Sequence, residues 1–257
     1  MTISFAGKGG VGKTTICSLL SLYLDKKGFK VLAIDADPDS NLATSLGAKE
    51  CTPLSQNKEL LSSIVQNTKS GLNGFYELNV SVENVVEEYG KSWGNQGDIM
   101  TLGWSKNGGE GCYCVENTAL SSMIKSVDKN KYDFIIIDGE AGLEHLSRGV
   151  FSNSDLLVLV YQMGKRSIQT ANDAKKLAKD LGIKNTKNAI CGYKDNELDL
   201  FKEIFKENFS LKIPSLNSIR EKDIFGKKLE LKEEIEKEID VFFDEIKVIK
   251  DDEPKRS

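Results

Sequence analysis

The stretch GKGGVGKTT, residues 7–15, constrains the fold of this chain more than any other feature. It directly follows the apolar run TISFA and leads into a segment with helical periodicity, predicted as a helix over 14–27. The glycines therefore lie at a turn from a strand into a helix, where the backbone can approach a phosphate closely. The chain is expected to begin with a phosphate-binding strand, loop and helix.

The glycines alone would fit either a dinucleotide site or a P-loop site for a nucleoside triphosphate. They satisfy G-x-G-x-x-G, and Asp35 follows Gly12 by 23 residues, as in a dinucleotide site. Lys13 and Thr14 decide against that interpretation, because G-x-x-x-x-G-K-T places an ammonium on the β- and γ-phosphates and a hydroxyl on magnesium. We therefore expect magnesium-ATP. The loop residues expected to contact it are Gly7, Lys8, Gly9, Gly10, Val11, Gly12, Lys13, Thr14 and Thr15.

Short apolar runs alternate with amphipathic segments along the chain. This alternation predicts an α/β domain with a doubly wound, mostly parallel sheet. We expect a single domain over 1–250, an irregular insertion near 67–95, and a frayed tail at 251–257. The predicted strands are 2–6, 30–35, 98–102, 132–138, 155–161 and 186–190. A packed C-terminal helix should bury one face, made by Ile235, Ile239, Phe242, Ile246 and Ile249.

Composition narrows the classes of partner and compartment. The net charge of −4 favours no nucleic-acid partner, and no apolar run is long enough to span a membrane. The N-terminus shows no export segment, so we expect a cytoplasmic protein. Five cysteines, an odd number in a reducing compartment, indicate metal, redox or core roles rather than disulfides. Cys17, Cys51 and Cys191 stand singly and are expected in the core.

Acidic residues follow two of the predicted strands. Asp37 and Asp39 lie in DADPDSN, where open α/β sheets bind ligands, and a carboxylate near the γ-phosphate can position water. Asp138 ends the run YDFIIID and is expected to hold magnesium together with Thr14. His145 is the only histidine and is expected to be structural.

The loop KGGVGKT resembles the deviant Walker A loop of the nitrogenase iron protein/MinD/ParA class of P-loop ATPases. The resemblance implies that Lys8 reaches the partner's phosphates across a homodimer. It also implies that Asp37 orients or deprotonates the attacking water and that Asp39 lies near magnesium. DGEAGLEHLSRG is similar to the switch II segment of that class, with Gly142 available to the γ-phosphate.

Cys112 and Cys114 form a Cys-x-Cys pair, which is a weak signal because zinc or an iron–sulfur cluster usually takes four ligands. A two-fold dimer would supply four thiolates about one axis. Such a site suits zinc or nickel(II).

Three segments, GGEGCYCVENTALSSMI, DGEAGLEHLSRG and RSIQTANDAKKLAKDLGIK, closely resemble the CooC-type accessory ATPases that mature the nickel site of carbon monoxide dehydrogenase. The resemblance implies a metal ion at the dimer interface, held by Cys112 and Cys114, and a nickel-dependent CO dehydrogenase or acetyl-CoA synthase-type client. The chain departs from the family at Gln162-Met163 and at Cys191, on the side of the nucleotide base, whereas Pro214 lies in a matching segment.

Two other functions remain open on sequence grounds. One is an ATP-driven reductase like the nitrogenase iron protein, although that class typically takes its cysteines from two separated segments. The other is a MinD/ParA-like positioning ATPase. The acidic charge and the lack of a basic amphipathic tail disfavour it.

Overall fold

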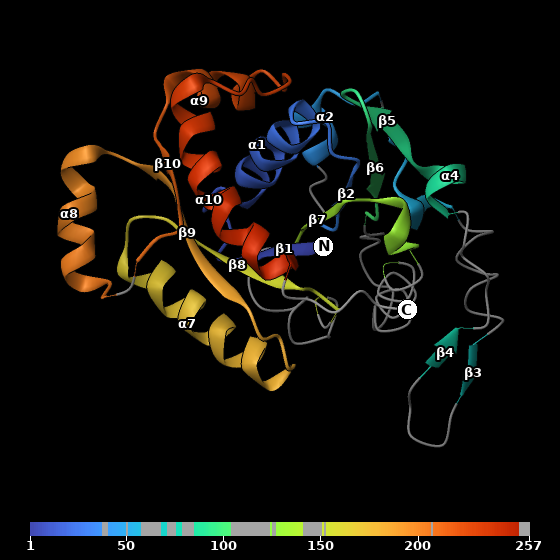
Figure 1. The fold of residues 1–257 in the computed structure, drawn as a ribbon, viewed down its shortest axis with the longest axis horizontal. Coiled ribbons are helices and arrows are strands. Elements are labelled where there is room, and N and C mark those ends of the chain that lie inside the picture. Colours follow the sequence, from blue (N-terminus) through green and yellow to red (C-terminus); the bar gives the residue numbers. More distant parts are fainter. Residues whose placement is uncertain are drawn as a thin grey trace, which may run out of the picture.

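The computed structural model of the chain describes residues 1–37, 41–49, 51–57, 68–70, 76–78, 85–103, 124, 127–140, 151, 153–206 and 208–251. The strands of its large sheet are β1 (Thr2–Ala6), β2 (Val31–Asp35), β5 (Lys91–Trp93), β6 (Gly97–Thr101), β7 (Phe134–Asp138), β8 (Leu156–Tyr161), β9 (Thr186–Tyr193) and β10 (Leu211–Pro214). Their order is β10-β9-β8-β1-β7-β2-β6-β5, and only β5 runs antiparallel to its neighbour (Figure 1). The predicted α/β class with a mostly parallel sheet is confirmed.

The six predicted strands are present because their side chains are buried on both faces of the sheet. In β2, Leu32 and Ile34 point into one hydrophobic cluster, whereas Val31 and Ala33 point into the other. A strand with two buried faces needs a continuous apolar run, which is the pattern that the sequence shows.

Helices cover both faces of the sheet. One cluster takes in buried residues of α1 (Lys13–Lys26), α2 (Leu42–Leu46) and α10 (Glu233–Asp251), with α9 (Asn217–Ile224) packed at its edge. The other takes in residues of α4 (Val85–Tyr89), α7 (Lys165–Asp180) and α8 (Asp195–Ile204). Among the described helices, none combines the length and the hydropathy that a helix crossing a bilayer needs.

The structure corrects three details of the expected organisation. The segment 67–95 includes regular elements: α4, the edge strand β5, and a separate antiparallel ribbon of β3 (Thr68–Ser70) and β4 (Tyr76–Leu78). The edge strand β10 was not predicted, because four residues ending in proline carry little strand signal. Asp251, expected in the tail, is the last residue of α10.

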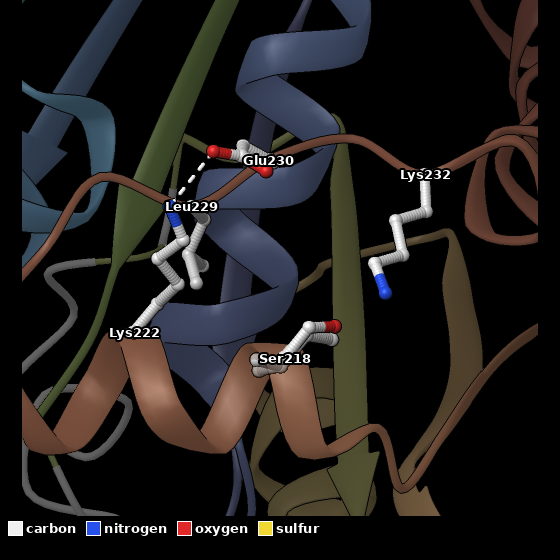
Figure 2. Close-up of a pocket in the computed structure, with 6 residues that line it drawn as sticks. Ser218, Lys222, Leu229, Glu230 and Lys232 are labelled. Carbon is white, nitrogen blue, oxygen red and sulfur yellow. Dashed lines mark hydrogen bonds and ion pairs between the residues drawn. The ribbon is translucent and has the colours of Figure 1, made fainter.

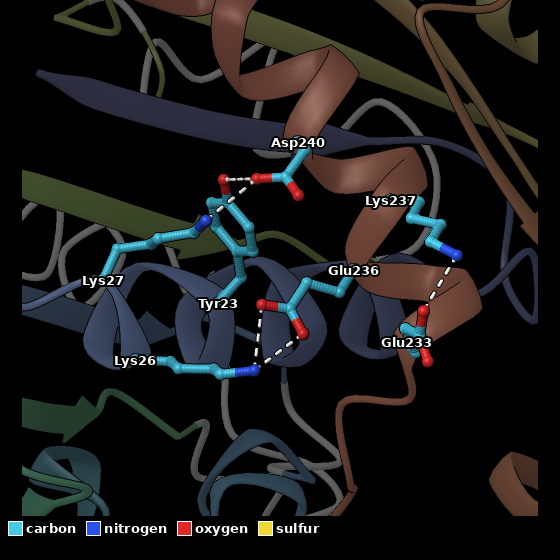
Figure 3. A network of polar contacts seen from close by, with 7 residues as sticks. All are labelled: Tyr23, Lys26, Lys27, Glu233, Glu236, Lys237 and Asp240. Atoms are coloured by element: carbon cyan, nitrogen blue, oxygen red, sulfur yellow. Dashed lines mark hydrogen bonds and ion pairs between the residues drawn. The ribbon is translucent and has the colours of Figure 1, made fainter.

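The C-terminal helix α10 packs against α1, as Figure 3 shows. The predicted apolar face is covered by protein: Ile249 is half-buried, and the other four residues are fully buried, namely Ile235, Ile239, Phe242 and Ile246. Polar contacts flank that face: Lys26 Nζ lies 2.7 Å from Glu236 Oε2, and the Tyr23 hydroxyl donates to Asp240. Exposed ion pairs contribute little to stability, so apolar burial holds this helix in place.

This packing predicts unequal effects of two truncations on α10. Ile239→Ala should lower the free energy of unfolding by about 3 kcal/mol, because it leaves a cavity in the core. Val241→Ala, whose parent side chain is 61% exposed, should change it by less than about 0.5 kcal/mol. Both variants replace a β-branched residue with alanine in the same helix, so the change in helix propensity is about the same in both. Urea unfolding followed by circular dichroism measures both, and equal small losses would contradict the packing.

Candidate functional site: a phosphate loop beside two buried acids

The loop between β1 and α1 has a shape that only glycine permits at several points. A Cβ on Gly7 would lie 2.5 Å from the carbonyl oxygen of Val160 in β8. Gly10 and Gly12 adopt positive φ angles of 76° and 92°. Val11 is buried and anchors the loop to the core, whereas its tip is exposed. The tip consists of Lys8, Gly9 and Gly10.

Helix α1 begins at this loop without a capping side chain at its N-cap residue. Gly12 is the N-cap in the left-handed region, without a side-chain hydrogen bond. The first helical bond runs from the N–H of Ile16 to the carbonyl of Gly12 at 3.0 Å. The N–H groups ahead of it and the helix dipole favour an anion. Lys13, with its residue 5% exposed, adds a cation, so the loop is suited to phosphate.

Asp138 ends β7 beside the loop and is completely buried. Neither of its carboxylate oxygens makes a hydrogen bond to a described residue, although the Thr14 hydroxyl lies close enough to act on its charge. Burial raises the pKa of this carboxyl, and the Thr14 hydroxyl and the Lys13 charge oppose that rise. An unsatisfied buried carboxylate near a hydroxyl offers the oxygen donors that Mg²⁺ prefers. These residues therefore fit the predicted magnesium site.

Asp35 faces Asp138 across β2 and β7 but uses its carboxylate differently. Its Oδ1 accepts the N–H of Asp37 at 3.2 Å, and its Oδ2 accepts the N–H of Leu42 at 3.0 Å. Burial, followed by the charge of Asp138, raises the pKa of Asp35, and the two N–H groups oppose this. From the sequence, Asp35 stands out only as the acid that a dinucleotide site would need, and this role is not predicted by it. An acid that ends a fully buried strand was the available signal, because it must find backbone donors there.

Asp37 lies half-buried just beyond β2, at the same edge of the sheet as Asp138. After burial, its negative charge adds to the effects that raise the pKa of both Asp138 and Asp35, so it lies close enough to act on both carboxyls. The structure thus brings Asp37, Asp138 and the phosphate loop together. Several predicted site residues fall outside the described part of the chain, namely Asp39, Cys112, Cys114 and Gly142. His145, expected to be structural, lies outside it as well. Among the described residues, no group of three or more His, Cys, Asp and Glu residues could hold a metal ion.

The two single cysteines nearest the loop are core residues. Cys17 is completely buried in α1, where burial and then the nearby charge of Asp138 raise the pKa of its thiol. Cys191 is also buried, which raises the pKa of its thiol to about 12. Its Sγ lies under the loop, where it would meet a Cβ on Gly12 at 2.5 Å. Pro214 ends β10, beside Tyr193 of β9.

A small pocket lies between α9 and the segment that leads to α10 (Figure 2). Lys222 and Glu230 bridge it with an ion pair of 2.7 Å, and the buried hydroxyl of Ser218 has no hydrogen-bond partner among the described residues. None of the predicted site residues lines this pocket. Its lining residues are Ser218, Ile219, Lys222, Leu229, Glu230 and Lys232.

Comparisons with known proteins agree with a nucleotide site. Residues 1–190 match the family described as AAA domain. The chain is 32% identical, over 96% of its length and 97% of the relative, to an uncharacterized ATP-binding protein of Methanocaldococcus jannaschii. It is 35% identical, over 72% of its length and 70% of the relative, to the carbon monoxide dehydrogenase accessory protein CooC of Rhodospirillum rubrum.

Solved structures share the fold. The septum site-determining protein MinD from Pyrococcus horikoshii OT3, complexed with Mg-ADP, aligns over 100% of both chains with a TM-score of 0.69 and 21% identity. At that identity the likeness concerns the fold alone. It confirms the predicted similarity to MinD/ParA-type P-loop folds.

The loop geometry predicts that alanine is tolerated differently at two glycines. Gly10→Ala should cost about 1–2 kcal/mol, because alanine at positive φ is strained and nothing lies within 4 Å of the new Cβ. Gly12→Ala should cost more, because its Cβ also collides with Cys191. Adding Cys191→Ala should recover part of the loss in the Gly12 variant and none in the Gly10 variant. Thermal unfolding measures all four variants, and equal recovery in both backgrounds would contradict the contact.

Proposed function

We propose a function on the premise that the chain belongs to the AAA domain family of P-loop ATPases. In this proposal the protein binds magnesium-ATP, hydrolyses it slowly and delivers nickel to a CO dehydrogenase or acetyl-CoA synthase-type enzyme. One observation carries the ATPase assignment. The N-terminus of α1, the buried Lys13 and the carboxylate of Asp138, which has no hydrogen-bond partner in the described part of the chain, meet at one edge of the sheet.

Each group then has a task in phosphoryl transfer, which depends mainly on positioning and on charge. Lys13 and the first N–H groups of α1 bind the phosphates. Thr14 and Asp138 would hold magnesium, which would neutralise phosphate charge, and Asp39 is the acid that the resemblance assigns to the surroundings of that ion. Asp37 orients the attacking water from its half-buried position beside Asp138.

Lys8 extends the site beyond a single chain. It lies at the exposed tip of the loop, whereas Lys13 already serves the chain's own phosphates from a buried position. A cation at this tip suits the phosphates of a second copy across a two-fold interface. We therefore propose that ATP closes a homodimer through Lys8.

The cargo site rests on Cys112 and Cys114. A two-fold dimer brings four thiolates to one axis, and four thiolates bind nickel(II) or zinc well. Because both chains supply ligands, metal binding and dimerisation must favour each other by the same free energy. The similarity to the CooC protein supports nickel as the cargo and a CO dehydrogenase-type enzyme as the client.

The two lysines of the loop should separate binding from dimerisation. Lys13→Ala should abolish ATP hydrolysis, because the phosphates lose their buried cation. Lys8→Ala should keep nucleotide binding but lose ATP-induced dimerisation, because its charge serves the partner. Phosphate release and light scattering with magnesium-ATP measure the two effects. Unchanged turnover in the Lys13 variant would refute the ATPase assignment, and an unchanged ATP-dependent dimer in the Lys8 variant would refute the cross-dimer role.

Metal analysis tests the cargo site. The anaerobically purified protein should hold about one nickel or zinc ion per two chains, with a sulfur-to-metal charge-transfer band when nickel is bound. Cys112→Ser and Cys114→Ser should each lose both. Cys51→Ser is the matched control, since Cys51 is a partly exposed cysteine of the described region. One metal per monomer, retained in the double serine variant, would rule the site out, and a brown iron–sulfur chromophore would favour the reductase.

A further inference from the structure

The loop that follows β2 is closed by a single carboxylate. Asp35 accepts the N–H of Asp37 through Oδ1 at 3.2 Å and the N–H of Leu42 through Oδ2 at 3.0 Å. These two amides lie at the two ends of the 37–42 loop, which carries Asp37 and Asp39. One buried side chain therefore ties the start of the loop to its end.

Asp35 is itself held on both sides by the sheet. Its carbonyl accepts the N–H of Leu102 beyond β6 at 2.8 Å. The N–H of the next residue, Ala36, donates to the carbonyl of Asp138 in β7 at 2.9 Å. The side chain is completely buried, so it has no room to swing away. The anchor of the loop is thus a fixed point of the central sheet.

The far end of the loop is held separately. Helix α2 has five residues, too few to be stable alone, and depends on the burial of Leu42 and Leu46. The carbonyl of Ser45 also accepts the N–H of Leu229 at 2.8 Å, from the segment that follows α9. Loss of the Asp35 contacts should therefore loosen the loop while α2 stays in place.

Asp35 and Asp138 differ in the hydrogen-bond partners of their carboxylate oxygens. Both oxygens of Asp138 lack a hydrogen-bond partner among the described residues, so they are open to a cation. Both oxygens of Asp35 already accept backbone N–H groups. We propose that Asp35 is a positioning residue that closes the 37–42 loop and thereby presents Asp37 to the attacking water. This inference rests on the role of Asp37 in the proposed function.

Steady-state kinetics of Asp35→Asn test the proposal. The amide keeps one acceptor and turns an NH₂ toward the other backbone N–H, so it breaks the closure at nearly constant volume. We expect kcat to fall about 100-fold, as for a misplacement of about 1 Å, with KM for magnesium-ATP changed less than about 3-fold. If the asparagine variant fails to fold, Asp35→Thr carries the same expectation, because threonine suits a strand and offers one acceptor.

Asp155→Asn is the matched control. Asp155 is also a buried aspartate that accepts a backbone N–H, from Thr2 at 2.6 Å, but it precedes β8 at the opposite edge of the sheet. Its variant should keep kcat within about 3-fold of the parent while losing stability. An equal loss of kcat in both variants would reduce Asp35 to a general structural role and overturn the proposal. So would a kcat within about 3-fold of the parent in folded Asp35→Asn, or a rise of KM that matches the fall of kcat.

A double variant tests whether Asp35 acts through Asp37. Asp35→Asn combined with Asp37→Ala should be no slower than Asp37→Ala alone, because the closure matters only when Asp37 is present. Multiplying losses would overturn the proposal. Parental turnover in Asp37→Ala would instead overturn the proposed role of Asp37, and the positioning role with it.

Hydrogen exchange separates this proposal from the ATPase assignment, since it needs no turnover. The amide of Leu42 should exchange at least about 10-fold faster in Asp35→Asn, whereas the amide of Leu229 should be unchanged. Equal exchange at Leu42 in parent and variant would overturn the closure. Faster exchange in a protein without ATPase activity would keep the closure and reject only the proposed function.

Discussion

The burial of two carboxylates side by side is the constraint on which the site depends. Asp35 and Asp138 end adjacent parallel strands and are shielded from water. A buried charge is costly unless it is paired or hydrogen-bonded, and two like charges add to that cost. The structure meets the cost in two ways: backbone N–H groups satisfy Asp35, and Asp138 is left for a cation beside Thr14 and Lys13. Magnesium and phosphate, if bound as proposed, would complete this arrangement electrostatically.

The phosphate loop is shaped by its contacts with neighbouring strands as much as by its own glycines. Gly7 lies against the backbone of β8, and Gly12 lies on the thiol of Cys191 in β9. Cys191 stands where the CooC-type family usually has an asparagine that reads the nucleotide base. Here it packs under the phosphate loop. Its raised pKa keeps the thiol protonated, which suits an apolar packing role better than metal binding.

Helices α1 and α2 connect the edge of the sheet that carries the phosphate loop to the rest of the domain. Helix α1 starts at the phosphate loop and packs against the C-terminal helix α10 through a buried apolar face. Helix α2 ends the 37–42 loop and is held by the segment that follows α9. The elements around the nucleotide site are therefore fixed to the core, which favours a precisely placed site over a flexible one.

The sequence by itself indicated the six buried strands, because buried parallel strands need continuous apolar runs. It also indicated the phosphate loop, because phosphate sites need glycines followed by lysine and threonine, together with Asp37 beyond β2 and Asp138 at the end of β7. It did not determine β5 and β10, because three residues, or four residues that end in proline, carry too little strand signal to be distinguished from loops. Only the tertiary structure decided that Asp35 accepts the N–H groups of Asp37 and Leu42 and that Cys191 lies under Gly12. It also decided that neither carboxylate oxygen of Asp138 has a hydrogen-bond partner among the described residues. Each of these depends on which strands become neighbours, and strand order is set by packing across the whole sheet, which no local pattern encodes.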